Sequence, residues 1–363
     1  MNADFILAIG ELGKEKGIDP ELLFQAVEEA LVTAYKKNFG SNQNVRVDMN
    51  KETGELHVYA QRHIVEEVGD DPNEISLEEA RKIDPRYEVD DIVETEATPR
   101  NFGRIAAQNA KQVVVQRIRE AERGMVFEKF SSRENDIVTG IIQRMENKNV
   151  YIDLGKAEAI LTPNEQIPGE IYQYHDRMKT YIVEVKKTSK GPQIMVSRTH
   201  PGLLKRLFEL EVPEIHDGLV EIKSVAREPG MRSKISVYTK DENIDPVGAC
   251  VGHKGMRVQT IVNELRGEKI DIVKYSAEPD QYVANALSPA KVVSTEVLEE
   301  EKICRVIVPD YQLSLAIGKE GQNARLAAKL TGWKIDIKSE SQAAEEAEQG
   351  TQEAGVAYEA DED

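Results

Sequence analysis

Two short stretches decide the fold of this chain: Val251-Gly-His-Lys-Gly255 and Ile317-Gly-Lys-Glu-Gly321. In both, the pattern G-x-x-G follows a β-branched residue and precedes a predicted helix, a further glycine and the tetrapeptide Lys-Ile-Asp-Ile. That tetrapeptide occupies residues 269–272 in the first copy and 334–337 in the second. One G-x-x-G pattern specifies little in a chain with 24 glycines, but two in the same context indicate an internal domain repeat.

Two predicted strands lie upstream of each G-x-x-G pattern, because polar and apolar residues alternate there. They cover residues 219–226 and 234–239 in the first copy, and 291–297 and 302–308 in the second. Each copy therefore has the predicted element order α-β-β-α-α-β. A simpler interpretation, two glycine-capped helix turns with solvated lysines, explains one loop but not the repetition of the whole order.

The element order and the G-x-x-G loop resemble the bacterial form of the KH domain, whose loop clamps about four nucleotides of RNA. Glycine lets a sugar-phosphate backbone approach the partly positive start of a helix. The resemblance implies RNA contacts at Gly252, His253, Lys254, Gly255 and Arg257 in the first clamp, and at Gly318, Lys319, Gly321, Asn323 and Arg325 in the second. Glu320 departs from this pattern, and since a carboxylate repels phosphate we expect the second clamp to bind more weakly.

Residues 132–200 are rich in short predicted strands, which indicates a small barrel of OB type. The strands are 137–145, 149–154, 157–161, 180–187 and 193–197. Asp136-Ile-Val-Thr-Gly140 and Val150-Tyr-Ile-Asp-Leu-Gly155 resemble the S-one domain, an RNA-binding OB fold. This resemblance implies that Tyr151 stacks on RNA bases, with Arg144, Lys148 and Lys156 nearby. A half-buried strand tyrosine packed on its neighbours is the alternative, and we expect weak RNA affinity because few other aromatic residues are present.

The N-terminal 131 residues predict an α/β domain with a long connector helix. Helices are expected at residues 4–16, 20–38 and 102–130, and strands at 44–49, 55–66 and 91–97. Asp19-Pro20 is a helix start, with the aspartate as N-cap and the proline at the first helical position. Ser76-Leu-Glu-Glu79 has the capping-box pattern and predicts a further short helix.

The net charge of −18 hides an uneven distribution. Residues 1–131 carry a net charge of −9 and the last 25 residues also carry −9, whereas residues 132–200 carry +1 and 201–338 carry −1. RNA affinity comes largely from lysine and arginine near phosphates. RNA binding in the middle and C-terminal parts must therefore rest on local basic clusters rather than on the overall charge.

The whole domain order is similar to the NusA family of bacterial transcription factors across residues 1–340. The stretch Phe102-Gly-Arg-Ile-Ala-Ala-Gln-Asn-Ala-Lys111 resembles the opening of that family's connector helix. The resemblance implies an elongation factor that contacts RNA polymerase through its N-terminal domain, holds nascent single-stranded RNA, and modulates pausing, termination and antitermination. Other transcription elongation factors are further candidate partners, and we expect a monomer.

The expected fold class is multidomain, with α/β and all-β parts. The expected domains are an N-terminal RNA-polymerase-binding domain with the connector helix (1–131), an OB-type S-one β-barrel (132–200), two tandem bacterial-type KH α/β domains (201–277 and 278–340) and a disordered acidic tail (341–363). Longer family members add C-terminal helical repeats, which have no counterpart in this sequence. Composition alone would suggest disorder for the tail, which lacks apolar periodicity.

We expect no enzymatic activity, no cofactor and no metal site. The six histidines show no metal-binding spacing, and the paired aspartates sit in polar turns. Cys250 and Cys304 lie in apolar stretches and are expected to be reduced and buried. No apolar run is long enough to cross a bilayer and no signal peptide is visible, so a cytoplasmic location is expected. Two alternatives remain: an RNA-processing exonuclease, for which no catalytic core fits in the first 131 residues, and a ribosome-bound KH protein.

Overall fold

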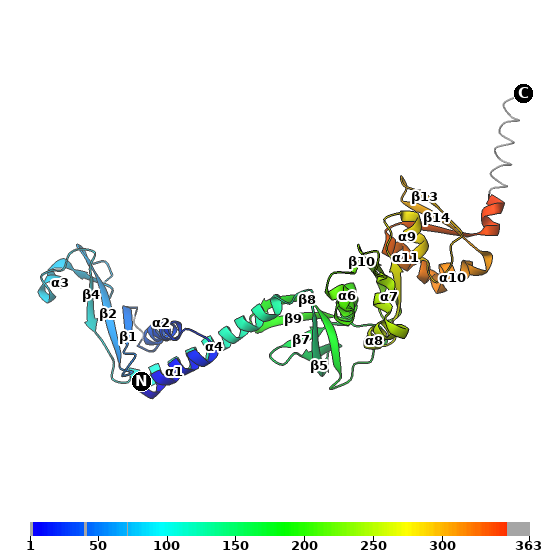
Figure 1. Ribbon diagram of the computed structural model, residues 1–363. Helices are drawn as coiled ribbons and strands as arrows, with labels where there is room; N and C mark the ends of the chain where they lie inside the picture. The colour runs from blue at the N-terminus through cyan, green and yellow to red at the C-terminus, as the bar shows by residue number, and fades with distance from the viewer. Residues whose placement is uncertain (1–2, 40–41, 71, 347–363) are drawn as a thin grey trace, which may run out of the picture. The chain divides into compact units, whose positions relative to one another are not determined.

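The structure, a computed structural model, describes residues 3–39, 42–70 and 72–346. The chain divides into two compact units (Figure 1). The N-terminal unit comprises the residues up to 128 together with residues 189–191. The C-terminal unit comprises residues 129–188 and the chain from residue 192 onward.

Helices and a small sheet build the N-terminal unit. The helices are α1 (Ala3–Lys16), α2 (Pro20–Phe39), α3 (Leu77–Ile83) and α4 (Phe102–Ser131), and the strands are β1 (Asn44–Met49), β2 (Leu56–Val65), β3 (Glu74–Ser76) and β4 (Ile92–Glu96). Strand β2 is antiparallel to β1 and β4 and parallel to β3. Apolar side chains from α1, α2, α4, β1 and β2 form the main core. The predicted elements of this region are confirmed to within a residue or two.

Local sequence signals set the starts of two helices in this unit. The Glu21 backbone N–H donates to Asp19 Oδ1 at 2.9 Å, so the aspartate caps α2 as predicted. The Glu79 N–H donates to the Ser76 hydroxyl at 3.3 Å, which caps α3. Both contacts satisfy N–H groups that have no partner within the helix.

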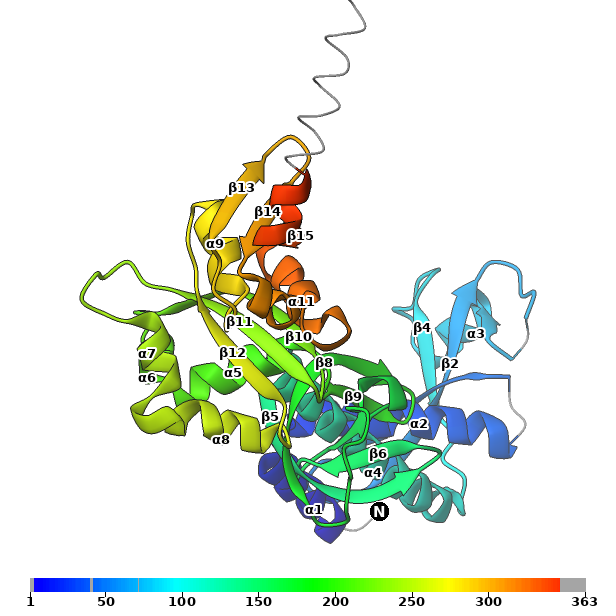
Figure 2. The same cartoon turned by 90° about the vertical axis from the view of Figure 1, so that its right-hand side faces the viewer.

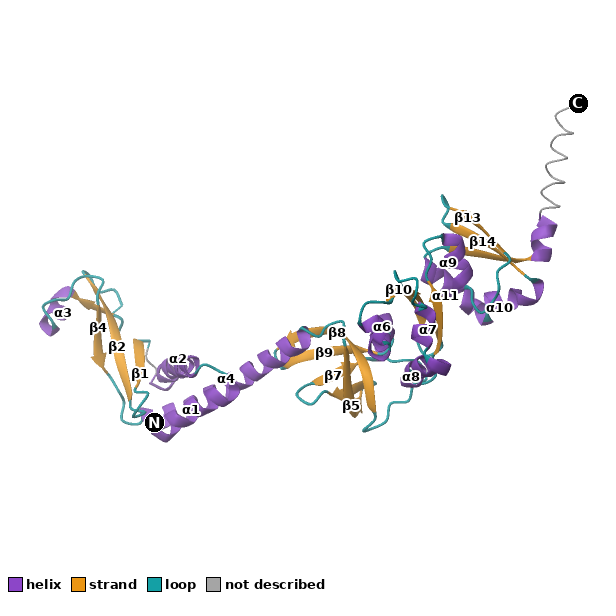
Figure 3. Cartoon of the chain, in the orientation of Figure 1, coloured by secondary structure: helices purple, strands orange, loops and turns teal. Residues whose placement is uncertain are grey.

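Five strands close into the barrel that was predicted from residues 132–200, and Figure 3 draws them in orange. They are β5 (Ile137–Glu146), β6 (Asn149–Asp153), β7 (Glu158–Leu161), β8 (Arg177–Thr188) and β9 (Gly191–Ser197), in the spatial order β5-β6-β7-β9-β8. A one-turn 3-10 helix, η1 (Pro163–Glu165), follows β7. Gly140 is required in β5, because a Cβ there would lie 2.4 Å from Ile152 Cγ2. The barrel wall is therefore packed without space for a side chain at that point.

Each repeat folds into the predicted α-β-β-α-α-β unit. The first KH unit contains α5 (Pro201–Glu211), α6 (Pro213–His216), β10 (Glu221–Glu228), β11 (Arg232–Tyr238), α7 (Pro246–Val251), η2 (His253–Gly255), α8 (Met256–Glu264) and β12 (Lys269–Lys274). The second KH unit contains α9 (Pro279–Ala286), β13 (Ser294–Leu298), β14 (Ile303–Val308), η3 (Asp310–Gln312), α10 (Leu313–Ile317), η4 (Lys319–Gly321), α11 (Gln322–Thr331) and β15 (Lys334–Ser339). In both, the middle strand is antiparallel to the first and parallel to the last.

The second KH unit packs through its helices on the sheet of the first. Helix α11 lies against β10 and β11 (Figure 2), and Ala226 and Val273 belong to the core of the second unit. The fully buried Lys234 ammonium donates to Asp271 Oδ2 and to the Ser288 carbonyl oxygen, both at 2.8 Å. Because a buried charge is costly unless it is paired, these contacts hold the two units in one arrangement.

The first part of the acidic tail corrects the prediction of disorder. Residues 340–346 are helical, and three contacts hold this turn on the second KH unit. The Ser341 hydroxyl donates to Asp310 Oδ2 at 2.8 Å, the Ser339 N–H donates to Gln342 Oε1 at 3.1 Å, and Lys338 pairs with Glu346 at 2.5 Å. Composition alone missed these tertiary partners. Residues 347–363 lie outside the described residues.

Among the described residues, none of the helices combines the length and the apolar character that crossing a membrane requires.

Candidate nucleic-acid interface

The two G-x-x-G loops have the same backbone conformation. Gly252 has φ 73° and ψ 177°, and Gly318 has φ 78° and ψ 169°. The third residue of each pattern, Lys254 or Glu320, is left-handed with φ 50° or 55°, and the final glycine is left-handed too. Because left-handed backbone is uncommon for residues with a side chain, the shared geometry indicates one loop design used twice.

The first glycine of each loop is required by packing. A Cβ on Gly252 would lie 2.7 Å from Arg257 Cγ, and one on Gly318 would lie 2.8 Å from both the Cβ and the backbone nitrogen of Asn323. By contrast, a Cβ on Gly255 or its equivalent Gly321 would meet nothing within 4 Å. The first glycine therefore closes the loop onto the following helix, whereas the last leaves an open surface where a backbone can approach.

Arg257 and Asn323 hold the loops closed; the full burial of Asn323 speaks against an RNA contact there, while an RNA contact by Arg257 stays a prediction. Arg257 Nη1 donates to the Ala249 carbonyl oxygen at 2.6 Å and pairs with Glu214 at 2.9 Å. Asn323 is fully buried, and its Nδ2 donates to the carbonyl oxygens of Ala316 and Leu287, each at 3.0 Å. Burial keeps Asn323 away from the clamp surface, whereas the Arg257 side chain is 32% exposed and uses its Nη1 inside the fold.

Arg325 forms an ion pair with a carboxylate of the first KH unit. Its Nε donates to Glu228 Oε1 at 2.7 Å and its Nη1 donates to the Glu320 carbonyl oxygen at 3.2 Å. Gln322 Nε2 also donates to the Glu228 carboxylate, at 2.8 Å. The Arg325 guanidinium, beside Glu228, holds the pKa of that carboxyl below its usual value. This arginine is therefore compensated at the contact between the two units.

Three basic side chains of the predicted set lie within the loops themselves and are exposed, and Arg325 beside the second loop is exposed although it is paired. His253 and Lys254 are exposed in the first loop and Lys319 in the second. None of the three forms a side-chain hydrogen bond or ion pair with the part of the chain that the structure describes. They lie beside the open final glycines, so the first loop presents two basic groups, while Lys319 has the exposed Glu320 next to it.

On the barrel, Tyr151 is half-buried and already covered on one face. The Arg144 guanidinium carbon lies 4.1 Å from the centre of the Tyr151 ring, and Arg144 pairs with Glu158 at 2.7 Å. Lys148 and Lys156 are exposed in the turns on either side of β6. The tyrosine is thus packed by its neighbours, as the alternative interpretation of the sequence had it, and the barrel face offers fewer ring surfaces than the S-one resemblance implies.

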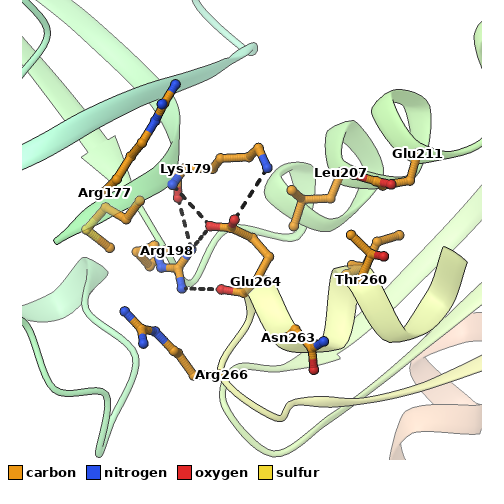
Figure 4. A pocket seen from close by; sticks show the side chains of 11 residues that line it. Arg177, Lys179, Arg198, Leu207, Glu211, Thr260, Asn263, Glu264 and Arg266 are labelled. Carbon is orange, nitrogen blue, oxygen red and sulfur yellow. Dashed lines mark hydrogen bonds and ion pairs between the residues drawn. The ribbon is translucent and has the colours of Figure 1, made fainter. Parts of the chain in front are cut away.

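A buried ion-pair network, which the sequence did not reveal, anchors the helix that begins at the first loop. Helix α8 ends at Glu264, whose carboxylate accepts from the Lys179 N–H at 3.1 Å and lies 3.4 Å from Arg198 Nη1 (Figure 4). Arg198 is fully buried, pairs with the buried Glu170, and donates to the Glu264 carbonyl oxygen at 3.0 Å. These contacts fix the end of α8 on the barrel and so fix the loop at its start.

A second buried pair joins the barrel's last segment to the first KH unit. Arg227 and Glu268 are both almost fully buried and form two hydrogen bonds at 2.8 and 2.9 Å. Arg227 Nη1 also donates to the His200 carbonyl oxygen at 2.8 Å, and the Ser233 hydroxyl donates to Glu268 at 2.6 Å. Since every charge has hydrogen-bonding partners, the network is able to persist in the interior.

Neither metal-binding nor reactive thiol chemistry is evident in the described part of the chain. There, no group of three or more His, Cys, Asp or Glu side chains could hold a metal ion. Cys250 and Cys304 are both buried, as predicted, and burial raises the pKa of the Cys250 thiol to about 12. A thiol with a raised pKa is a poor nucleophile.

Comparison with known protein families divides the chain in the same order. The NusA N-terminal domain matches residues 4–124, the S1 RNA binding domain 131–197, the NusA-like first KH domain 198–275 and the NusA-like second KH domain 279–345. The S1 description is that of the S-one domain that the barrel resembles.

Relatives of similar length carry one shared name, "Transcription termination/antitermination protein NusA". The protein from Halalkalibacterium halodurans is 66% identical over 95% of this chain and 90% of its own length. That from Bacillus subtilis is 65% identical over 95% of this chain and 93% of its own, and that from Thermus thermophilus is 42% identical over 92% and 89%. Identity at this level extends across all four domains, and the chain belongs to the NusA family.

Proposed function

We propose that this chain is a transcription elongation factor that acts in termination and antitermination by holding nascent RNA while attached to RNA polymerase. The observation that carries the proposal is the pair of G-x-x-G loops with one shared backbone geometry, set on two KH units that pack on each other. The printed names of the relatives supply the process in which such RNA binding would act.

The linkage of the RNA-binding modules supports binding of one continuous strand. The Arg198 and Arg227 networks tie the barrel to the first KH unit, and Lys234 and Glu228 tie the first KH unit to the second. A strand bound at one loop then meets the other at a high effective concentration. Weak individual loops can therefore give useful affinity together.

We assign the polymerase contact to the N-terminal unit. This unit is acidic, which disfavours RNA and suits a basic protein surface. Around its small second core, formed by Ile64, Ile75, Ala80 and Val93, large apolar side chains are exposed. These are Val68 (43% exposed), Ile83 (58%), Val89 (38%) and Ile92 (41%). Large exposed apolar side chains of this kind are candidates for a protein-binding surface.

A binding experiment tests both halves of the proposal. Purified RNA polymerase core should retain the full chain on a column, and Ile83→Asp combined with Ile92→Asp should abolish retention without changing RNA affinity. Loss of retention in a matched variant on another exposed site, Leu210→Asp, would contradict the assignment of the surface. An in vitro transcription assay on a template with an intrinsic terminator should show altered read-through on adding the chain.

The alternatives predict different outcomes. A ribosome-bound KH protein would bind RNA but would not be retained by polymerase. An exonuclease would shorten labelled RNA in the presence of phosphate and Mg²⁺. We propose a monomeric, cytoplasmic, non-catalytic factor, for which RNA remains intact and read-through changes.

A further inference from the structure

The two loops share a backbone but differ in charge. The first loop presents His253 and Lys254 without an adjacent carboxylate. In the second loop Lys319 is followed by the exposed Glu320, and Arg325 is paired with Glu228 at 2.7 Å. Phosphate affinity depends on uncompensated positive charge. We therefore expect the second loop to bind the RNA backbone weakly.

The second KH unit instead carries exposed apolar surface next to its loop. Tyr311 is 82% exposed, Leu315 46% and Ile317 37%, and all three lie on η3 and α10, which lead directly into Gly318. The positions 66 residues earlier in the first unit hold smaller side chains, namely Asp245, Ala249 and Val251. Exposed apolar side chains ahead of the loop are therefore specific to the second unit, whereas the first unit exposes Met256 (66%) directly after its loop.

The Tyr311 ring is presented by a backbone held on both sides. Asp310 accepts a hydrogen bond from the Ser341 hydroxyl at 2.8 Å, and Gln312 Oε1 accepts one from the Lys291 N–H at 2.6 Å. The ring itself makes no hydrogen bond or ring contact with the residues that the structure describes. Gly318 follows seven positions after Tyr311, which is roughly 10 Å at the 1.5 Å rise per residue of a helix. That is within the reach of a strand of about four nucleotides held by the loop.

We propose that Tyr311 is a base-stacking residue, and that it binds a base of the single-stranded RNA whose backbone passes the second loop. Leu315, four residues further along the chain, adds an exposed apolar side chain. The two KH units then bind different parts of the RNA. The first binds phosphates through His253 and Lys254, and the second binds bases through an uncharged ring. This inference rests on the proposed RNA-binding function and adds to it a residue that makes binding depend on base identity.

Phosphate binding by the first unit and base stacking by the second have two measurable consequences. Stacking involves no counterion release, so the contribution of Tyr311 is insensitive to salt, unlike that of Lys254. Stacking also grows with the size of the base, so purine-rich strands gain more from Tyr311 than pyrimidine-rich strands. Both measurements distinguish the loss of a stacking ring from a general effect of the substitution on folding or charge.

Fluorescence anisotropy tests the proposal with the full chain and labelled oligo(A) and oligo(U). Each RNA has about twelve nucleotides, which is enough to reach two loops that each hold about four. Tyr311→Ala should weaken oligo(A) binding about 5-fold or more, weaken oligo(U) binding less, and leave the salt dependence unchanged. Tyr311→Phe keeps the ring and should bind as the parent does. Lys254→Gln should instead reduce the slope of log affinity against log salt by about 0.7 on both RNAs.

Tyr311→Trp provides a direct readout, because stacking on a base quenches indole emission. RNA should quench this variant more than the parent, whose single tryptophan, Trp333, gives the background. Equal quenching of the two, or Tyr311→Ala binding both RNAs within twofold of the parent, overturns the role of Tyr311. If Lys254→Gln still weakens binding in that case, the proposed RNA-binding function stands. If the parent binds neither RNA, the proposed function itself fails.

Discussion

Replacing Gly318 by alanine should open the second loop. Gly318 has φ 78° and ψ 169°, a region that residues with a side chain almost never adopt, and forcing alanine there costs about 1–3 kcal/mol. The added Cβ would also lie 2.8 Å from the backbone nitrogen of Asn323. Backbone cannot rotate away as a side-chain end can, so overpacking adds about 1–3 kcal/mol. The total, about 2–6 kcal/mol, is a large part of the stability of a small domain.

The matched control is Gly321→Ala in the same loop. Gly321 is left-handed, with φ 73° and ψ 13°, but a Cβ there would meet nothing within 4 Å, so only the left-handed backbone cost of about 1–2 kcal/mol applies. Hydrogen exchange of peptides covering residues 313–331 reports local opening without assuming two-state unfolding of a multidomain chain. Exchange should accelerate strongly in Gly318→Ala and slightly in Gly321→Ala. Equal acceleration in the two variants would refute the packing argument.

Three further perturbations follow from the contacts around the first KH unit. Glu170→Gln removes the fully buried ionic partner of Arg198 and leaves only Glu264, which is 3.4 Å away and partly exposed. It should lower the unfolding free energy by up to about 3–5 kcal/mol, visible as a lower melting temperature, and a change below about 1 kcal/mol would contradict the reasoning. His200 Nδ1 accepts a hydrogen bond from the Gly202 N–H at 3.0 Å, and burial lowers the pKa of this histidine from 6.5. The stability that the neutral ring contributes is therefore present above pH 6.5 and is lost as the pH falls below that value. His200→Asn keeps the cap, and its melting temperature should depend less on pH between 7.5 and 5.5 than that of the parent. Lys254→Asp should weaken RNA binding in a filter assay without changing the melting temperature, and parent-like affinity would remove this lysine from the interface.

Local signals in the sequence predicted the element order of all four domains. The two Lys-Ile-Asp-Ile copies, the alternating strands and the capping residues Asp19 and Ser76 act within a few residues of chain, so their effects can be read without knowing the fold. The same holds for the two loops, since glycine adopts the positive φ values of Gly252 and Gly318 without the steric cost that a side chain would add. The family resemblance followed from this order.

The roles of side chains beside the loops were decided by the tertiary structure. Arg257, Asn323 and Arg325 occupy positions that suit RNA contact in the sequence, yet their partners include Glu214, Leu287 and Glu228, which are 36 to 97 residues away along the chain. Composition likewise missed the helix at residues 340–346, because its partner is Asp310, 31 residues earlier.

Sequence patterns report what each residue does to its own backbone and which face it occupies. They do not report whether a polar group reaches water or a distant partner, because that depends on distances set only when separate elements pack. The loops were therefore determined by the sequence alone, through backbone conformation. Which charges remain available at them, and the exposure of Tyr311 beside the second, were decided by folding, since burial and ion pairing are properties of the assembled chain.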